Sequence, residues 1–169
     1  MIQPHTDWLW REQQGCLALV SGEICHQTSF AVGAHWTAPF SIDDVEHYWF
    51  FASQLQRYFA DDTSIAAASI DAVAALKQPW PACRGFWFDY LQQGAVDAGA
   101  LVQLCGQHPA NAIVLAQHGM NVLVLLLHPV TTLQGKQIPH GHVVQVPFNR
   151  VRPLPLAAPH HTEPLCRSA

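Results

Sequence analysis

The spacing of apolar residues changes near residue 93, and this change limits the folds open to the chain. Between residues 42 and 77 apolar residues recur at three- and four-residue steps, as they do along an amphipathic helix. From residue 99 onward this period is absent, and short apolar runs are separated by glycine and proline. We therefore predict an α+β fold with an N-terminal α/β unit over residues 1–93 and a small all-β, barrel-like unit over residues 94–153.

The first thirty residues are predicted to form β-strands. Trp8 and Trp10 alternate with other residues and give a short strand one aromatic face. A second apolar strand is expected over residues 16–20, and a third over residues 23–30. Ser-Gly at residues 21–22 provides the flexible backbone that a tight hairpin between them requires.

Two helices are predicted to follow. Ser41 is placed as the N-cap of a helix over residues 42–59, and Asp43 and Asp44 occupy its first turn, where carboxylates interact favourably with the helix dipole. A second, alanine-rich helix is expected over residues 61–77, again with an acidic pair at its start. General acid–base catalysis is an alternative role for both carboxylate pairs, but helix capping accounts for them.

After the second helix, residues 84–90 alternate aromatic and other side chains, which predicts a strand returning to the N-terminal unit. The all-β unit is expected to contain short apolar strands at residues 101–105, 112–117 and 122–127. Residues 154–169 are rich in proline and histidine without periodicity, so we predict a disordered tail.

The composition disfavours several classes of partner. Only 12% of the 169 residues are charged and the net charge is −4, so we expect no nucleic-acid partner. The longest purely apolar run, residues 122–127, is far too short for a membrane-spanning helix, and no membrane insertion is expected. Five cysteines without a C-x-x-C pair fit reduced thiols in the cytoplasm. The N-terminus lacks the pattern of a signal peptide.

No motif in the sequence indicates catalysis. The phosphate-binding loop, the dinucleotide-binding glycine pattern and the G-x-S-x-G nucleophile elbow are all absent from the sequence. We therefore predict no catalytic residues, no metal site and no cofactor. A nucleophile formed by Cys105 and His108 was considered, but a cysteine in an apolar run is more often a small core residue.

The eleven histidines leave one alternative open. His140 and His142 would lie on one face of a strand and could provide two metal ligands. A third ligand is not evident from the sequence. The alternative function is thus a small metal-dependent or hydrolytic enzyme that uses the histidine-rich C-terminal unit.

A binding surface is better supported than an active site. The six tryptophans lie in the predicted N-terminal unit, and tryptophan is enriched at binding hot spots. An apolar groove with a basic rim, suited to a partner with apolar anchors and acidic flanks, is expected where tryptophans and basic residues coincide. The candidate partner-binding residues are Lys77, Trp80, Arg84 and Trp87 near the end of the second helix, with Arg150 and Arg152 as a second set.

Several short segments occur in an order that is characteristic of one family. They are Asp-Trp-Leu-Trp at residues 7–10, Phe-Ser-Ile-Asp-Asp-Val at 40–45, Phe-Trp-Phe at 86–88, Leu-Leu-Leu-His-Pro-Val at 125–130, Leu-Gln-Gly-Lys at 133–136 and Asn-Arg-Val-Arg-Pro at 149–153. With these segments in this order, residues 4–154 resemble the ZapC family of bacterial cell-division proteins. The segment at residues 37–40 is shorter than the family pattern, and the tail after residue 153 is unlike it.

The resemblance implies a non-enzymatic accessory of the cytoplasmic division ring at mid-cell. Such proteins bind polymers of the tubulin-like GTPase FtsZ, bundle its protofilaments and lower its GTP turnover. The implied fold is an α/β region followed by a β-barrel-like region, and the protein is expected to be a monomer or to self-associate weakly. The matching motifs are structural, so they transfer no functional role to any residue.

Overall fold

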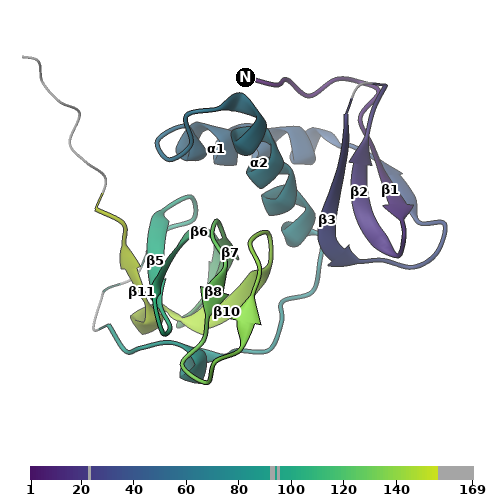
Figure 1. Ribbon diagram of the computed structural model, residues 1–169. Coiled ribbons are helices and arrows are strands. Elements are labelled where there is room, and N and C mark those ends of the chain that lie inside the picture. Colours follow the sequence, from purple (N-terminus) through teal and green to yellow (C-terminus); the bar gives the residue numbers. More distant parts are fainter. Residues whose placement is uncertain (23, 92–93, 95, 156–169) are drawn as a thin grey trace, which may run out of the picture.

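The computed structural model describes residues 1–22, 24–91, 94 and 96–155, and its described part confirms the α+β class (Figure 1). Two α-helices lie between an N-terminal sheet and a C-terminal all-β region. The N-terminal sheet has the order β3-β2-β1-β4 and is antiparallel. Its strands are β1 (Leu9–Gln13), β2 (Cys16–Val20), β3 (Cys25–Ala31) and β4 (Thr37–Pro39).

The helices are α1 (Ile42–Leu55) and α2 (Asp62–Leu76), and both begin at the predicted caps. Ser41 Oγ accepts a hydrogen bond from the backbone N–H of Asp44, and the Asp44 carboxylate accepts one from the N–H of Ser41. This reciprocal pair is a capping box. Asp61 caps α2 by accepting from the N–H of Ser64 at 2.7 Å, and this bond holds the pKa of Asp61 below its usual range.

The first helix ends four residues earlier than predicted. Beyond Leu55 the backbone makes tighter bonds, from Arg57 N–H to Gln54 and from Tyr58 N–H to Leu55, so residues 56–59 form a turn. Within the described residues, neither helix has the length and apolarity needed to cross a membrane.

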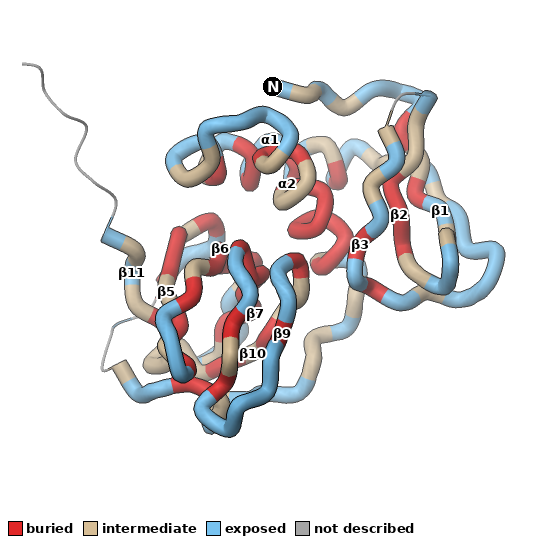
Figure 2. Tube along the Cα trace, in the orientation of Figure 1, coloured by how far each residue is buried: buried red, intermediate tan, exposed pale blue. Residues whose placement is uncertain are grey.

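Helix α2 is buried on almost all sides, which explains its high alanine content. Alanine and serine let the helix approach β3 on one side and the C-terminal sheet on the other (Figure 2). One apolar cluster therefore includes residues of the N-terminal sheet, both helices and the C-terminal sheet. The core thus crosses the predicted unit boundary at residues 93 and 94.

The C-terminal sheet is antiparallel with the order β10-β7-β6-β5-β11. Its strands are β5 (Leu101–Cys105), β6 (Pro109–His118), β7 (Asn121–Leu126), β10 (Val143–Pro147) and β11 (Val151–Pro153), and a separate two-stranded ribbon pairs β8 (Val130–Thr131) with β9 (Gln137–Ile138). Along β7, Leu123 and Leu125 face the helices, whereas Val122 and Val124 enter a second core on the other face. This burial of both faces explains the continuous apolar run.

The C-terminal sheets are not closed into a barrel, in contrast to the barrel-like prediction. Among the described residues, β10 forms a ladder with β7 and β11 forms one with β5, but no ladder joins β10 to β11. The two edge strands are joined by the short 3₁₀ helix η2 (Phe148–Arg150), which directs the chain from one edge to the other. Pro147 ends β10 and lacks the N–H that a ladder needs.

The predicted strand over residues 84–90 is also wrong, because this segment contains the 3₁₀ helix η1 (Gly85–Trp87). Its backbone bonds go to several elements: Arg84 N–H donates to Gln145 on β10, and Asp89 N–H donates to Cys105 on β5. We call residues 83–91 the strap, because their backbone hydrogen bonds reach from β10 to β5 of the C-terminal sheet. The alternating aromatic residues of this segment therefore do not pair with one neighbouring strand. Of its four aromatic side chains, only that of Phe88 is fully buried.

The predicted tail over residues 154–169 lies largely outside the described residues. Leu154, at its start, donates its N–H to the carbonyl of Leu101 and packs against the helical core. Between residues 100 and 150, the described chain contains no helix longer than the three residues of η2, as the loss of helical periodicity predicted.

Candidate functional site

Large apolar side chains are exposed around the strap. Phe86 is 57% exposed and Tyr90 is 55% exposed, and Leu133 of the neighbouring turn is also exposed. The turn is held against the strap because Leu133 N–H donates to the carbonyl of Trp87 at 2.9 Å. Gln134 Nε2 donates to the carbonyl of Phe86 at the same distance. These bonds join the β8–β9 turn to η1, although the two are far apart in sequence.

Two cations lie over the indole ring of Trp87. The Nζ of Lys136 is 4.7 Å from the ring centroid, and the guanidinium carbon of Arg84 is 5.5 Å away. Phe86 contacts the same indole edge-on, with ring centroids 6.2 Å apart. Cations over an aromatic ring are held in place without neutralising their charge, so they stay able to attract an anion.

A third cation extends this arrangement along the strap. Arg150 Nη1 donates to the carbonyl of Phe88 at 2.9 Å, and its guanidinium lies 5.5 Å from the ring centroid of Tyr90. Asp89 is exposed on the same segment. We define the aromatic–basic surface by these contacts as Arg84, Phe86, Trp87, Tyr90, Leu133, Lys136 and Arg150.

A pocket of about 340 Å³ opens beside Trp87 and Lys136, and its wall includes Ile138 and His142. Nδ1 of His142 and Nε of Arg150 are buried and have no hydrogen-bond partner among the described residues. Buried polar atoms without partners are uncommon and often mark functional regions. The pocket could receive an apolar side chain while the cations at its rim contact carboxylates.

Three of the six predicted partner-binding residues belong to this surface: Arg84, Trp87 and Arg150. Lys136, Phe86, Tyr90 and Leu133 also belong to this surface but were not among the residues predicted from the sequence. Leu133 and Lys136 occur in the Leu-Gln-Gly-Lys segment, which was noted only for its family resemblance. No local pattern shows that this turn folds against Trp87, so the sequence alone could not identify it.

The other three predicted residues lie elsewhere. Lys77 Nζ pairs with the buried carboxylate of Asp44 at 2.6 Å. Trp80 is partly buried and packs against the apolar cluster that includes both helices. Its ring lies edge-on to that of His118, with the ring centroids 6.3 Å apart. Arg152 donates to the side-chain carbonyl of Gln103 on β5.

The two histidines of the metal alternative do not share a face. They flank Gly141 in the turn between β9 and β10, so they are not on a strand. His140 lines pockets next to α2, whereas His142 lines the pocket next to Trp87. No group of three His, Cys, Asp or Glu residues suited to a metal occurs in the described part of the chain.

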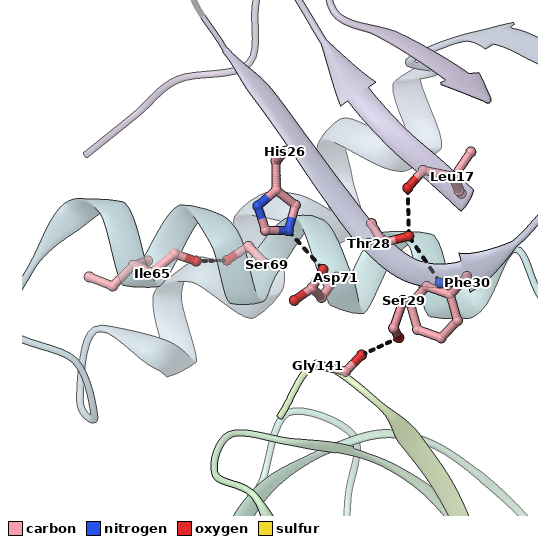
Figure 3. Close-up of polar contacts among 9 residues, drawn as sticks. All are labelled: Leu17, His26, Thr28, Ser29, Phe30, Ile65, Ser69, Asp71 and Gly141. Carbon is pink, nitrogen blue, oxygen red and sulfur yellow. Dashed lines mark hydrogen bonds and ion pairs between the residues drawn. The ribbon is translucent and has the colours of Figure 1, made fainter. Parts of the chain in front are cut away.

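A second polar site lies between β3 and α2, and the sequence analysis did not predict it (Figure 3). His26 Nε2 is 2.8 Å from Oδ1 of Asp71, a residue that is only 9% exposed. Ser29 Oγ, also on β3, donates to the carbonyl of Gly141 at 2.8 Å and so connects this site to the C-terminal region. The site therefore joins three segments distant in sequence.

Comparison with known proteins adds no family assignment. No protein-family model matches this chain, and no curated protein matches it significantly. The resemblance to the ZapC family consequently stays a prediction from the sequence.

Proposed function

We propose that this chain is a non-enzymatic, cytoplasmic accessory of bacterial cell division that binds FtsZ polymers at mid-cell. In this proposal it bundles the protofilaments of the division ring and lowers the GTP turnover of FtsZ. The proposal rests on the resemblance to the ZapC family, and it assigns FtsZ contact to the aromatic–basic surface.

One observation carries this assignment: Lys136 and Arg84 both lie over the indole of Trp87, next to exposed Phe86. The chain as a whole is acidic, with only eight lysines and arginines. Three of these eight, including Arg150, belong to one surface with exposed aromatic side chains. FtsZ filaments are acidic, so such a surface would steer association through charge and retain the partner through apolar burial.

Cosedimentation of FtsZ polymers with this protein tests the proposal. The wild-type protein should pellet with the polymers, increase bundling and lower the rate of GTP hydrolysis. The double variant Arg84→Glu, Lys136→Glu should bind about tenfold or more weakly at low salt, because two attractive charges become repulsive.

The matched control is Arg57→Glu, which reverses an exposed charge in the α1–α2 turn. This control should bind FtsZ like the wild type. If the wild-type protein does not pellet with FtsZ, the proposed function fails. If the double variant binds as tightly as Arg57→Glu, the function stands but the aromatic–basic surface is not the contact.

The alternative of a small metal-dependent or hydrolytic enzyme requires histidines that converge on one pocket. His140 and His142 line different pockets and so lend it no support. Zinc content after chelation and dialysis tests this alternative directly. One tightly held zinc per chain that is lost in His140→Ala would favour it over the proposed function.

A further inference from the structure

A cleft lies where β3, α2 and the β9–β10 turn meet, and Figure 3 shows the polar contacts His26–Asp71 and Ser29–Gly141 made by these segments. Two adjoining pockets, of about 190 and 310 Å³, share His26, Asp71, His140 and Gly141 in their walls. Gly141 has a positive φ of 75°, and a Cβ there would lie 3.1 Å from Oδ2 of Asp71. A glycine at this position therefore allows the turn to come close to the carboxylate.

The Asp71 carboxylate is only partly satisfied. Its Oδ1 is bonded to His26 Nε2, whereas no hydrogen-bond partner for Oδ2 occurs among the described residues. His26 contacts only this one oxygen, so Oδ2 is left to accept a hydrogen bond from a ligand in the cleft. The Asp71 side chain is 13% exposed, so its carboxylate still reaches the solvent in the cleft, and a carboxylate that is largely buried is commonly paired with a cation.

The described walls of the cleft provide no permanently charged cation. Among the described residues that line the two pockets there is no lysine or arginine. The only basic groups at the walls are the imidazoles of His26 and His140. The electrostatic preference of the cleft is therefore for a ligand that brings a permanent positive charge.

The smaller pocket also has apolar walls next to the carboxylate. Phe59, Leu125 and Leu127 line it, together with Ala67 and Ala68 of α2. The two alanines leave room at the helix surface that larger residues would fill. An alkyl chain would be buried here with its charged end directed at Asp71.

We propose that this cleft binds an alkyl chain that ends in a guanidinium or ammonium group, with Oδ2 of Asp71 as the acceptor. Such a group is present in an arginine or lysine side chain and in a small free amine. The site does not involve the aromatic–basic surface, so this inference is independent of FtsZ binding.

Titration of the full chain, followed by NMR chemical shifts, tests the proposal. The probe is n-butylguanidinium, and the neutral control of the same shape is n-butylurea. The guanidinium should shift signals of residues around Asp71 and bind about tenfold more tightly than the urea, as a charge-assisted hydrogen bond provides. Equal affinity for the two probes, or no shifts near Asp71, would overturn the proposal.

Two variants separate binding from folding. Asp71→Asn keeps the shape of the side chain and should lose the tenfold preference for the cation. The exposed Asp89→Asn removes the same charge elsewhere and should retain it. Because Asp71→Asn changes a buried bond, Ala68→Phe is the second variant: it fills the pocket without altering the polar pair. Unchanged guanidinium binding to a folded Ala68→Phe protein would refute the site.

A further arm distinguishes the two sources of the ligand. N-acetylarginine amide presents the guanidinium as a protein side chain does. Binding of both this probe and n-butylguanidinium would assign the cleft to a basic side chain of a partner. Binding of n-butylguanidinium alone would assign it to a small free amine.

Discussion

Nζ of Lys77 lies 2.6 Å from Oδ1 of Asp44, and this pair connects the C-terminal cap of α2 to the first turn of α1. The Asp44 carboxylate is 4% exposed and also accepts hydrogen bonds from Trp10 Nε1 and Ser41 N–H, at 3.0 and 2.9 Å. Strand β1, both helices and one cap thus meet at one buried carboxylate. Lys77 compensates its charge, so this lysine stabilises the fold instead of providing a free contact.

Lys77→Met should therefore destabilise the protein without weakening FtsZ binding. Only the Asp44 end of this pair is buried, so removing the partly exposed Lys77 charge should cost about 1–3 kcal/mol in the free energy of unfolding. Urea denaturation measures this change, and Lys136→Met, which removes an exposed charge, is the control. If Lys77→Met is as stable as Lys136→Met, the pair has no structural role.

The ionisation of Tyr48 should make the stability of the protein decrease at alkaline pH. Its hydroxyl donates to the carbonyl of Ile2 at 2.7 Å, and burial, followed by the charge of Asp62, raises its pKa to about 12. In the unfolded chain tyrosine ionises near the ordinary value of 10. The unfolded state thus loses its proton first, and stability falls as pH rises from 10 towards 12, by about 2–3 kcal/mol in all.

Tyr48→Phe should remove this contribution. At pH 7 the variant should be about 1 kcal/mol less stable, since it lacks the hydrogen bond to Ile2. Between pH 10 and 12 its unfolding free energy should decrease less steeply than that of the wild type. Denaturation curves at each pH measure this slope, and parallel slopes for the two proteins would contradict the assignment.

Trp80 and Trp87 should behave differently when each is replaced by alanine. Trp80 packs against the helical core, so Trp80→Ala should lower the unfolding free energy by about 2–4 kcal/mol and leave FtsZ binding unchanged. Trp87 holds two cations at the aromatic–basic surface, so Trp87→Ala should weaken binding by about 1–3 kcal/mol. Thermal unfolding and cosedimentation together separate the effects. The reverse result would place the contact near Trp80.

Gly106 lies close to the backbone of Thr131. A Cβ at this position would lie 2.0 Å from the carbonyl oxygen of Thr131, which also accepts the N–H of Gln107. Gly106→Ala should displace this backbone and cost about 2–3 kcal/mol. Gly33→Ala, which has no atom within 4 Å of its added Cβ, should change stability little. Chemical denaturation of both variants measures the difference.

Local structure was predictable where neighbouring residues determine it. Ser41 and Asp61 start their helices because the side chain that caps each N-terminus is next to it in the chain. The apolar run that starts at Val122 forms the buried strand β7, which ends at Leu126, because its length and branched side chains favour a strand. The change of period near residue 93 likewise separates helices from the all-β region.

Two local predictions failed because distant groups decided the outcome. The alternating aromatics of residues 84–90 form η1 since their backbone bonds go to β10 and β5 instead of one partner strand. The expected barrel is open because η2 carries the chain from β10 to the opposite edge. Periodicity reports which faces are buried, but it does not name the partner strand.

The candidate sites depend almost entirely on tertiary structure. Lys136 is brought to Trp87 by a turn, Lys77 pairs with the buried carboxylate of Asp44, and His26 meets Asp71 across 45 residues of sequence. The composition by itself, with few basic residues and many tryptophans, indicated which residue types a binding surface would use. Only the tertiary structure decided which of them meet, because side-chain contacts across elements depend on packing geometry that no local pattern encodes.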